Sequence, residues 1–188
     1  MHAMIDIETL GIGHNVPMFE LGLKLFRVNE DMNGMGFSFA LQERMVWHID
    51  LLDVVLSTGF VPQKDTISWW QQQSYDPRVM PRVHLKDALL ELTGVFQKAP
   101  VEFVWGNSPS FDLVILEQHY SALGLDKPWN FRMELDYRTI SWLYKTRYRH
   151  GVPKEVAGLV AHNAADDAEG QATTLIQMLK EGLINAEG

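Results

Sequence analysis

The sequence predicts an α/β fold in which a mixed central β-sheet has α-helices on both of its faces. Extended segments come first, and helical segments then alternate with further short extended segments, which is the order typical of such a sheet. The chain has 188 residues, of which 46% are hydrophobic. This is enough for one well-buried core and too little for two ordinary domains. We therefore expect a single domain over residues 1–188.

Strands are expected to make up most of the first quarter of the chain. An apolar run at 4–10 carries two acids, and residues 17–28 read as a second strand. A hairpin at 29–34 leads into a returning strand at 37–42. Residues 45–49 either continue that strand or form a third one.

Helices and short strands alternate over the rest of the chain. Residues 65–74 and 84–98 are expected to form helices, and residues 101–105 and 130–135 to form strands. The segment 51–62 fits a helix or an irregular loop, and both stay open. The apolar side chains of the second helix recur at helical spacing, at Leu85, Leu89, Leu92 and Phe96.

Two acids, Asp6 and Glu8, stand at the end of the first strand. Because successive side chains of a strand point to opposite faces, both carboxylates project to one side and Ile7 projects to the other. The two carboxylates repel each other unless a cation lies between them, and their hard oxygen atoms favour Mg²⁺ or Mn²⁺ over zinc. Taken alone, such a pair also fits a solvated turn.

A third acid, Asp112, follows the strand at 101–105 and a turn. It falls in the first turn of a helix expected over 110–118, with Ser108 or Ser110 as the N-cap. An aspartate at this position complements the helix dipole, which would be a purely structural role. Its apolar neighbours and the other acidic motifs favour a functional site.

The most specific segment is 162–167, which reads His-Asn-Ala-Ala-Asp-Asp and leads into an amphipathic helix expected over 164–179. Regular helical phase pairs His162 with Asp166. Asp167 shares a face with the histidine only if His162 lies outside the helix. A loop that simply caps the helix, without chemistry, is the alternative.

Together these motifs resemble those of a known enzyme class. Asp6-x-Glu8, Asn107-x-x-x-Phe111-Asp112 and His162-x-x-x-x-Asp167 are similar to the motifs of the DEDDh class of DnaQ-like 3′→5′ exonucleases. In that class four residues separate the histidine from the metal-binding aspartate, so the resemblance selects Asp167 over Asp166. Segments 65–74 and 137–139 look like those of a subgroup that includes the phage exodeoxyribonuclease A proteins and the mycobacterial adenosine-specific exoribonuclease.

The resemblance implies a ribonuclease H-like fold and a two-metal hydrolysis. Four acids would hold two divalent cations, Mg²⁺ or Mn²⁺, and 5′-mononucleotides would be released from a free 3′ end. His162 would take the proton from the attacking water as general base. The metal ligands are then Asp6, Glu8, Asp112 and Asp167, and the expected substrate contacts include Thr9, Leu10, Asn107 and Phe111.

A basic segment between residues 138 and 154 contains five basic residues and a histidine, no acid, and several aromatic residues. Such a stretch is a candidate track for single-stranded nucleic acid. Its expected substrate contacts are Arg138, Arg147 and Arg149. A solvated helix whose Trp142 and Leu143 face the core fits the same stretch equally.

The adjacent Trp69 and Trp70 lie in an expected helix, where neighbouring side chains point about 100° apart. One of them is therefore expected in the core. The other can cap a pocket or meet a partner subunit, so a homodimer stays open.

Charge and composition exclude several classes of protein. The net charge of −8 argues against a protein that coats duplexes, and fits one that grips a chain end through metal ions. The absence of cysteine excludes disulfides and cysteine-ligated zinc. No apolar run approaches the roughly 20 residues of a membrane span, and no basic leader precedes the first strand. We expect a cytoplasmic protein without membrane contact.

The expected partner is the 3′ end of a single-stranded DNA or RNA, and the choice between the two sugars stays open. Two other functions stay open as well. One is a catalytically inactive nucleic-acid-binding or interaction module with the same fold. The other is an endonuclease of the ribonuclease H type, which would cut internally and would not use the histidine motif.

Overall fold

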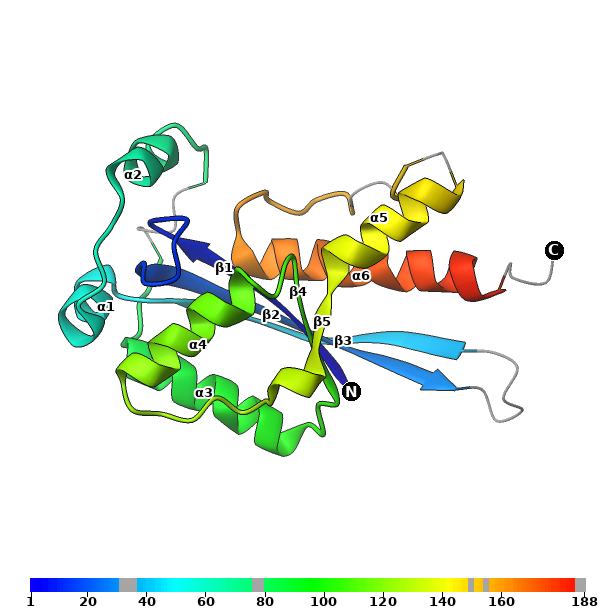
Figure 1. The fold of residues 1–188 in the computed structure, drawn as a ribbon, viewed down its shortest axis with the longest axis horizontal. Coiled ribbons are helices and arrows are strands. Elements are labelled where there is room, and N and C mark those ends of the chain that lie inside the picture. Colours follow the sequence, from blue (N-terminus) through cyan, green and yellow to red (C-terminus); the bar gives the residue numbers. More distant parts are fainter. Residues whose placement is uncertain (31–36, 76–79, 149–150, 154–155, 185–188) are drawn as a thin grey trace.

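A computed structural model describes residues 1–30, 37–75, 80–148, 151–153 and 156–184. Five strands of the described chain form one mixed sheet in the order β3-β2-β1-β4-β5 (Figure 1). The pairs β1–β2 and β2–β3 are antiparallel, whereas β1–β4 and β4–β5 are parallel. The strands are β1 (His2–Thr9), β2 (Met18–Glu30), β3 (Phe37–His48), β4 (Phe103–Gly106) and β5 (Glu134–Asp136).

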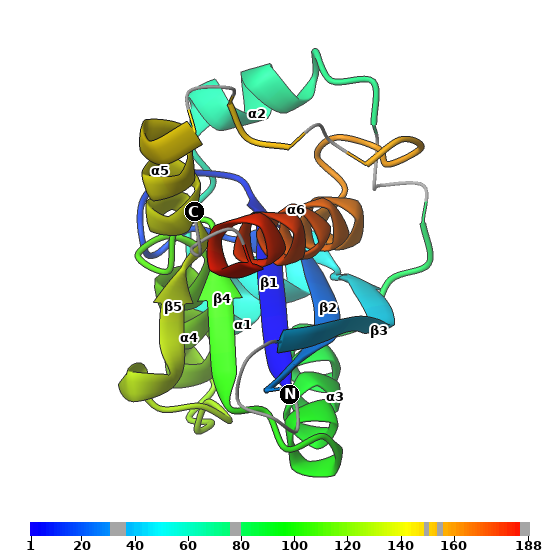
Figure 2. The same ribbon diagram turned by 90° about the vertical axis from the view of Figure 1, so that its right-hand side faces the viewer.

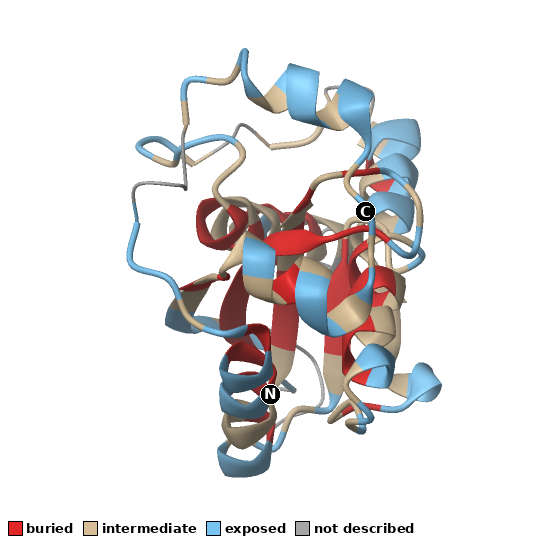
Figure 3. Cartoon of the chain, turned by 90° about the vertical axis from the view of Figure 1, so that its left-hand side faces the viewer, coloured by how far each residue is buried: buried red, intermediate tan, exposed pale blue. Residues whose placement is uncertain are grey.

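Helices cover both faces of this sheet, as Figure 2 shows, which confirms the expected fold class. Helices α1, α3 and α4 pack against one face of the sheet, and α5 and α6 pack against the other. The short α2 contains no buried residue and lies at the edge of the molecule (Figure 3). The helices are α1 (Leu51–Thr58), α2 (Lys64–Trp70), α3 (Leu85–Lys98), α4 (Asp112–Ala122), α5 (Tyr137–Tyr148) and α6 (Ala164–Ile184).

Strand β1 divides the core into two hydrophobic clusters. Ala3, Ile5 and Ile7 pack in the cluster that also contains residues of α1, α3 and α4. Met4 packs on the opposite face, against residues of α6. This alternation follows from the two-residue period of a strand, and it places Asp6 and Glu8 on one face, as expected; that face is the one that α6 covers.

Parallel pairing of β1 with β4 brings two carboxyl ends to the same edge of the sheet. Met4 pairs with Trp105, so the acids that follow Met4 lie beside the loop that follows β4. That loop leads directly into α4, whose first residue is Asp112. In sheets with parallel strands, ligands bind outside such carboxyl ends.

Most of the expected elements are confirmed. The strand at 17–28, the strand at 101–105 and the helices at 84–98 and 164–179 are present with small shifts of their ends. Residues 37–48 form one continuous strand, so the segment at 45–49 continues it. The turn of the expected hairpin falls mainly outside the described residues.

One open alternative is resolved in favour of a helix, and two expectations need correction. The open segment 51–62 contains α1, which Asp50 caps by accepting a hydrogen bond from the Asp53 backbone N–H at 3.0 Å. The helix expected over 65–74 ends at Trp70. The strand expected over 130–135 was mostly wrong, because Phe131–Met133 form a 3₁₀ turn and only Glu134–Asp136 pair with β4.

No helix in the described part of the chain is both long and apolar enough to cross a membrane.

Candidate functional site

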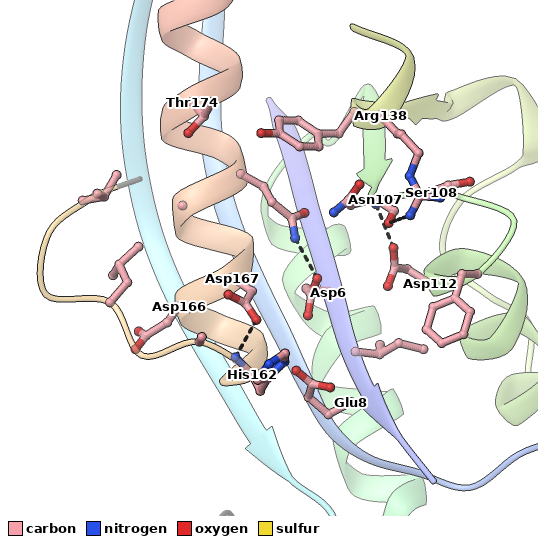
Figure 4. Close-up of a pocket in the computed structure, with 18 of the residues that line it drawn as sticks. Asp6, Glu8, Asn107, Ser108, Asp112, Arg138, His162, Asp166, Asp167 and Thr174 are labelled. Atoms are coloured by element: carbon pink, nitrogen blue, oxygen red, sulfur yellow. Dashed lines mark hydrogen bonds between the residues drawn. The ribbon is translucent and has the colours of Figure 1, made fainter. Parts of the chain in front are cut away.

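A cavity of about 670 Å³ opens at the sheet edge where β1 and β4 end (Figure 4). All five residues expected to be catalytic line it, although they come from three distant segments, and for this reason we call it the catalytic cavity. They are Asp6 and Glu8 from β1, Asp112 from α4, His162 from the loop before α6, and Asp167 from the first turn of α6.

Asp6 is a residue of β1, and its side chain points towards α6. Its Oδ1 accepts a hydrogen bond of 2.8 Å from Nε2 of Gln171, one turn of α6 beyond Asp167. Burial raises the pKa of Asp6 well above its ordinary value, and the negative charge of Asp112 raises it further, while the Gln171 bond opposes this.

Glu8, His162 and Asp167 form the tightest group of possible metal ligands among the described residues. One ligand atom from each side chain lies within 4.8 Å of the others. Burial and the neighbouring Asp6 charge raise the pKa of Glu8 to about 10. A carboxyl group with such surroundings is protonated at neutral pH unless a cation compensates its charge.

Asp112 begins α4, and its Oδ2 accepts a hydrogen bond of 2.7 Å from the backbone N–H of Asn107. Burial raises its pKa to about 7, although the bond from Asn107 and the charge of Arg138 lower it. The N-cap of α4 is Phe111, so the expectation of a serine N-cap was wrong.

The start of α6 separates the two adjacent aspartates. His162 has a φ of 64° and lies outside the helix, the condition that its pairing with Asp167 requires. Its backbone N–H donates to Oδ2 of Asp167 at 2.9 Å. Asp166 instead pairs with Arg44 and accepts a hydrogen bond of 2.8 Å from the Val160 N–H. Asp166 therefore has structural partners, whereas Asp167 faces Glu8 and His162.

The donor set fits divalent cations of the hard class. Besides Asp166, which pairs with Arg44, the described cavity gathers four carboxyl groups. Burial raises the pKa values of Asp6, Glu8 and Asp112, and neighbouring negative charges raise those of Asp6 and Glu8 further. A cation bound among them would reverse both effects. Carboxylate oxygen is the ligand type that Mg²⁺ and Mn²⁺ prefer.

The expected substrate contacts are found in different places. Asn107, Phe111 and Arg138 line the catalytic cavity, and Arg138 donates from Nη2 to the Asn107 carbonyl at 3.0 Å. Thr9 is not among the cavity residues, because it is buried and its hydroxyl donates to the Gly11 carbonyl at 2.6 Å.

Leu10 lines a second cavity of about 310 Å³, whose walls include Phe19, Ile67 and Trp70. Arg147 is exposed on α5, outside the catalytic cavity. Arg149 lies outside the described residues.

The segment 137–148 is a helix, but the alternative in which Trp142 and Leu143 face the core was wrong. Trp142 and Leu143 are exposed at 63% and 50%, whereas Tyr144 is buried against α6. The exposed tryptophan stays available for contact with a ligand.

Sequence reasoning missed Gln171, and it identified Trp69 and Trp70 without predicting their contact with His162. Gln171 has no motif around it, and only its position one turn after Asp167 could have suggested it. Trp69 and Trp70 pack edge-on against the His162 ring, with centroids 4.8 and 5.9 Å away. Trp69 is 41% exposed and Trp70 is partly buried, so the expectation that one of them lies in the core was wrong.

Comparison with solved structures identifies related folds. E. coli exonuclease I in complex with a dT13 oligonucleotide matches with a TM-score of 0.56 and 14% identity, over 95% of this chain and 40% of that one. Exonuclease X in complex with 5′ overhanging duplex DNA matches with a TM-score of 0.55 and 15% identity, over 100% of this chain and 96% of that one. The chain thus spans less than half of exonuclease I. No curated protein matches it.

At these identities the solved structures show the fold alone, and it is the ribonuclease H-like fold expected from the sequence. A family model gives the closer relation. The model of the 3′-5′ exoribonuclease Rv2179c-like domain matches residues 1–179, which include every residue of the catalytic cavity. The chain therefore belongs to the Rv2179c-like family of 3′-5′ exoribonuclease domains.

Proposed function

We propose that the protein hydrolyses single-stranded nucleic acid from a free 3′ end and releases 5′-mononucleotides, with Mg²⁺ or Mn²⁺ as its cofactor. One observation carries the proposal. Glu8, His162 and Asp167 converge within 4.8 Å, in a cavity that also contains Asp6 and Asp112. Acids and a histidine from three segments meet at the end of two parallel strands, and the chain belongs to an exoribonuclease family.

Asp6, Glu8, Asp112 and Asp167 hold the cations in this proposal. Two divalent cations bound there would supply an activated water and would stabilise the leaving 3′-oxygen. The protein contributes positioning of the acids. Gln171 orients Asp6, and the Asn107 N–H orients Asp112, so neither carboxylate has to reorganise when the substrate arrives.

His162 accepts the proton of the attacking water. The role fits its position in the cavity wall beside Glu8 and Asp167. Two contacts fix His162. Its backbone N–H donates to Asp167, and its imidazole ring packs against Trp69 of α2. An imidazole is suited to this task because its unperturbed pKa lies near neutrality.

The terminal nucleotide is held at the end of β1. Its base lies against Leu10 in the second cavity, which begins two residues beyond Glu8 and has Trp70 as a wall. The scissile phosphate lies among the acids, and Arg138 meets the phosphates of the upstream strand. A net charge of −8 leaves few other sites for phosphate contacts, so recognition depends on the chain end.

The direct test is digestion of single-stranded DNA and RNA labelled at the 5′ end, in Mg²⁺ and in Mn²⁺. We expect a ladder that shortens from the 3′ end, mononucleotide products, and no reaction in excess chelator. A 3′-phosphate should block the reaction. Efficient cutting of a covalently closed single strand would replace the proposal with an endonuclease.

Variants of the acids test the assigned roles. Asp6→Ala, Asp112→Ala and Asp167→Ala should each lower turnover by several orders of magnitude, because a lost ligand removes water activation and leaving-group stabilisation together. Asp166→Asn is the control. It should lower the melting temperature by weakening the pair with Arg44 while the rate stays within about tenfold of wild type. An indispensable Asp166 would reverse the choice between the two aspartates.

A further inference from the structure

Glu20 is a completely buried carboxylate that lies beneath the start of α6. Its Oε1 accepts a hydrogen bond of 2.9 Å from the backbone N–H of Ala164, the first residue of the helix. Its Oε2 accepts one of 3.0 Å from the hydroxyl of Tyr75, and Nδ1 of His48 lies 3.4 Å from the same oxygen. A buried carboxylate is costly unless it is fully bonded, so these partners hold it in one position.

Tyr75 connects this carboxylate to the catalytic loop. Its hydroxyl donates to Glu20 and accepts a hydrogen bond of 2.8 Å from Nδ2 of Asn163. Asn163 directly follows His162, and its Oδ1 also accepts from the Asp166 N–H at 3.0 Å. One tyrosine hydroxyl therefore bridges β2 to the turn that sets the backbone of His162.

The same region supports the imidazole ring. Trp69 packs against His162 at 4.8 Å and 85°, and Trp70 packs against it at 5.9 Å. The indole of Trp70 is itself fixed by a hydrogen bond of 3.0 Å to the Thr9 carbonyl. His162 adopts a left-handed φ of 64°, a conformation that a non-glycine residue keeps only when its surroundings impose it.

We propose that Tyr75 and Glu20 are positioning residues for His162, and that the hydroxyl of Tyr75 is the contact that holds the loop in its productive conformation. The inference rests on the proposed role of His162 as general base. Neither residue lines the catalytic cavity, although Glu20 lies opposite Glu8 in the β1–β2 ladder and its charge contributes to the raised pKa of Glu8. Tyr75 holds Asn163 and Glu20 holds Ala164, and these two residues directly follow His162. Through them, Tyr75 and Glu20 set the position of the histidine beside the metal ligands.

Tyr75→Phe tests the proposal, because it removes one oxygen atom from a partly buried side chain and leaves its ring in place. We expect kcat to fall on the order of tenfold, less than the roughly 10²–10⁴-fold expected for His162→Ala, with KM and metal affinity unchanged. Tyr120→Phe is the matched control. It removes a core hydroxyl bonded to the Leu89 carbonyl at 2.8 Å, and it should lower the melting temperature without changing kcat.

A double variant separates a positioning role from an independent one. If Tyr75 acts through His162, then Tyr75→Phe added to His162→Ala causes no further loss of kcat. Two losses that multiply in the double variant would overturn the proposal, and so would a single Tyr75→Phe variant with wild-type kcat.

A spectroscopic measurement is independent of activity. The His162 ring protons lie among two indole rings, and their NMR signal can be assigned by its loss in His162→Ala. Tyr75→Phe should move this signal towards that of a solvent-exposed histidine. If the signal moves but no exonuclease activity exists, then the proposed function fails and the positioning role stands. An unmoved signal in an active enzyme overturns the positioning role alone.

Discussion

Asp112 couples the stability of the protein to pH. Burial raises its pKa to about 7 in the folded protein, against an ordinary value of 3.8. Between these two values the folded state binds the proton more tightly than the unfolded state. The contribution of Asp112 to the free energy of unfolding is therefore fully present below about pH 4 and is lost as the pH rises through about 7.

This sign gives a measurable prediction. In excess chelator, the free energy of unfolding of the wild type minus that of Asp112→Asn should fall as the pH rises from about 4 to about 7. The subtraction is needed because His2 and His119, with pKa values lowered to about 4 by burial, act in the opposite direction. Urea unfolding at a series of pH values measures the difference. A difference that rises with pH would contradict the raised pKa.

Residue spacing predicted the site better than residue chemistry did. The strand period placed Asp6 and Glu8 on one face, and the five-residue step from His162 to Asp167 required a histidine outside the helix, which its φ of 64° provides. The bond from Gln171 to Asp6 joins residues 165 positions apart, and the position of Gln171 one turn after Asp167 is the only local sign of it. No local pattern could reveal the bonds of Tyr75 and Glu20 to the catalytic loop and α6.

The close approach of β2 to α6 fixes the start of this helix, next to the loop that carries His162. A Cβ atom added to Gly22 would overlap the carbonyl group of Ala164, so the first turn of α6 rests directly on the backbone of β2. This contact allows Glu20, two residues earlier on the same strand, to reach the Ala164 N–H. Any larger residue at position 22 pushes the helix away from the sheet.

Gly22→Ala should therefore destabilise the protein by roughly 1–3 kcal/mol, the usual cost of overpacking, and should also lower kcat. Gly94→Ala provides the contrast. Gly94 lies inside α3 with open space around it, so alanine there should add about 0.5–1 kcal/mol of stability and leave kcat unchanged. Urea unfolding and steady-state kinetics on both variants decide this. Equal stabilities would show that β2 and α6 can separate without cost.

Helix α5 leads away from the cavity and carries the upstream contacts in our proposal. Arg138 lines the cavity, and by helical geometry Trp142 and Lys145 lie on the same side of α5 as Arg138. Trp142 is 63% exposed, which suits stacking on a base of a single strand.

Trp142→Ala and Lys145→Ala should raise KM for long oligonucleotides while KM for dinucleotides stays constant. Lys145→Ala should also reduce the slope of the logarithm of the binding constant against the logarithm of the salt concentration by about 0.7, the value for one phosphate contact on a single strand. Leu143→Ala, an exposed neighbour on another side of the helix, is the control. Equal effects of all three variants would assign a general destabilisation of α5.

Sequence patterns predicted the elements of this region less well. The expected core face of α5 was wrong. Trp142 and Leu143 are adjacent apolar residues and were expected in the core for that reason, but tyrosines of this helix pack against α6 instead. Tyr144 is buried there with its hydroxyl bonded to Glu181, a partner that belongs to another helix. The three-residue β5 was obscured in the same way, since only its pairing with β4 defines it.

Ligand binding should be visible in the stability of the whole molecule. Because the cavity acids repel each other, Mn²⁺ together with a 5′-mononucleotide should raise the melting temperature more than the sum of the two added separately. Thermal unfolding with each addition measures this. Asp167→Ala should abolish the joint effect. A wild-type protein that responds to neither ligand would favour the inactive module considered from the sequence.

Helix α6 closes the active site with the last element of the described chain, although the site begins in the first strand. The order of synthesis therefore controls when the site can exist. A growing chain displays Asp6, Glu8 and then Asp112 long before His162 and Asp167 are made, and α6 must dock on β1 and β2 to complete the proposed cation site. If His162 and Asp167 act as we propose, a nascent chain gains exonuclease activity only after α6 has been made and has docked on the sheet.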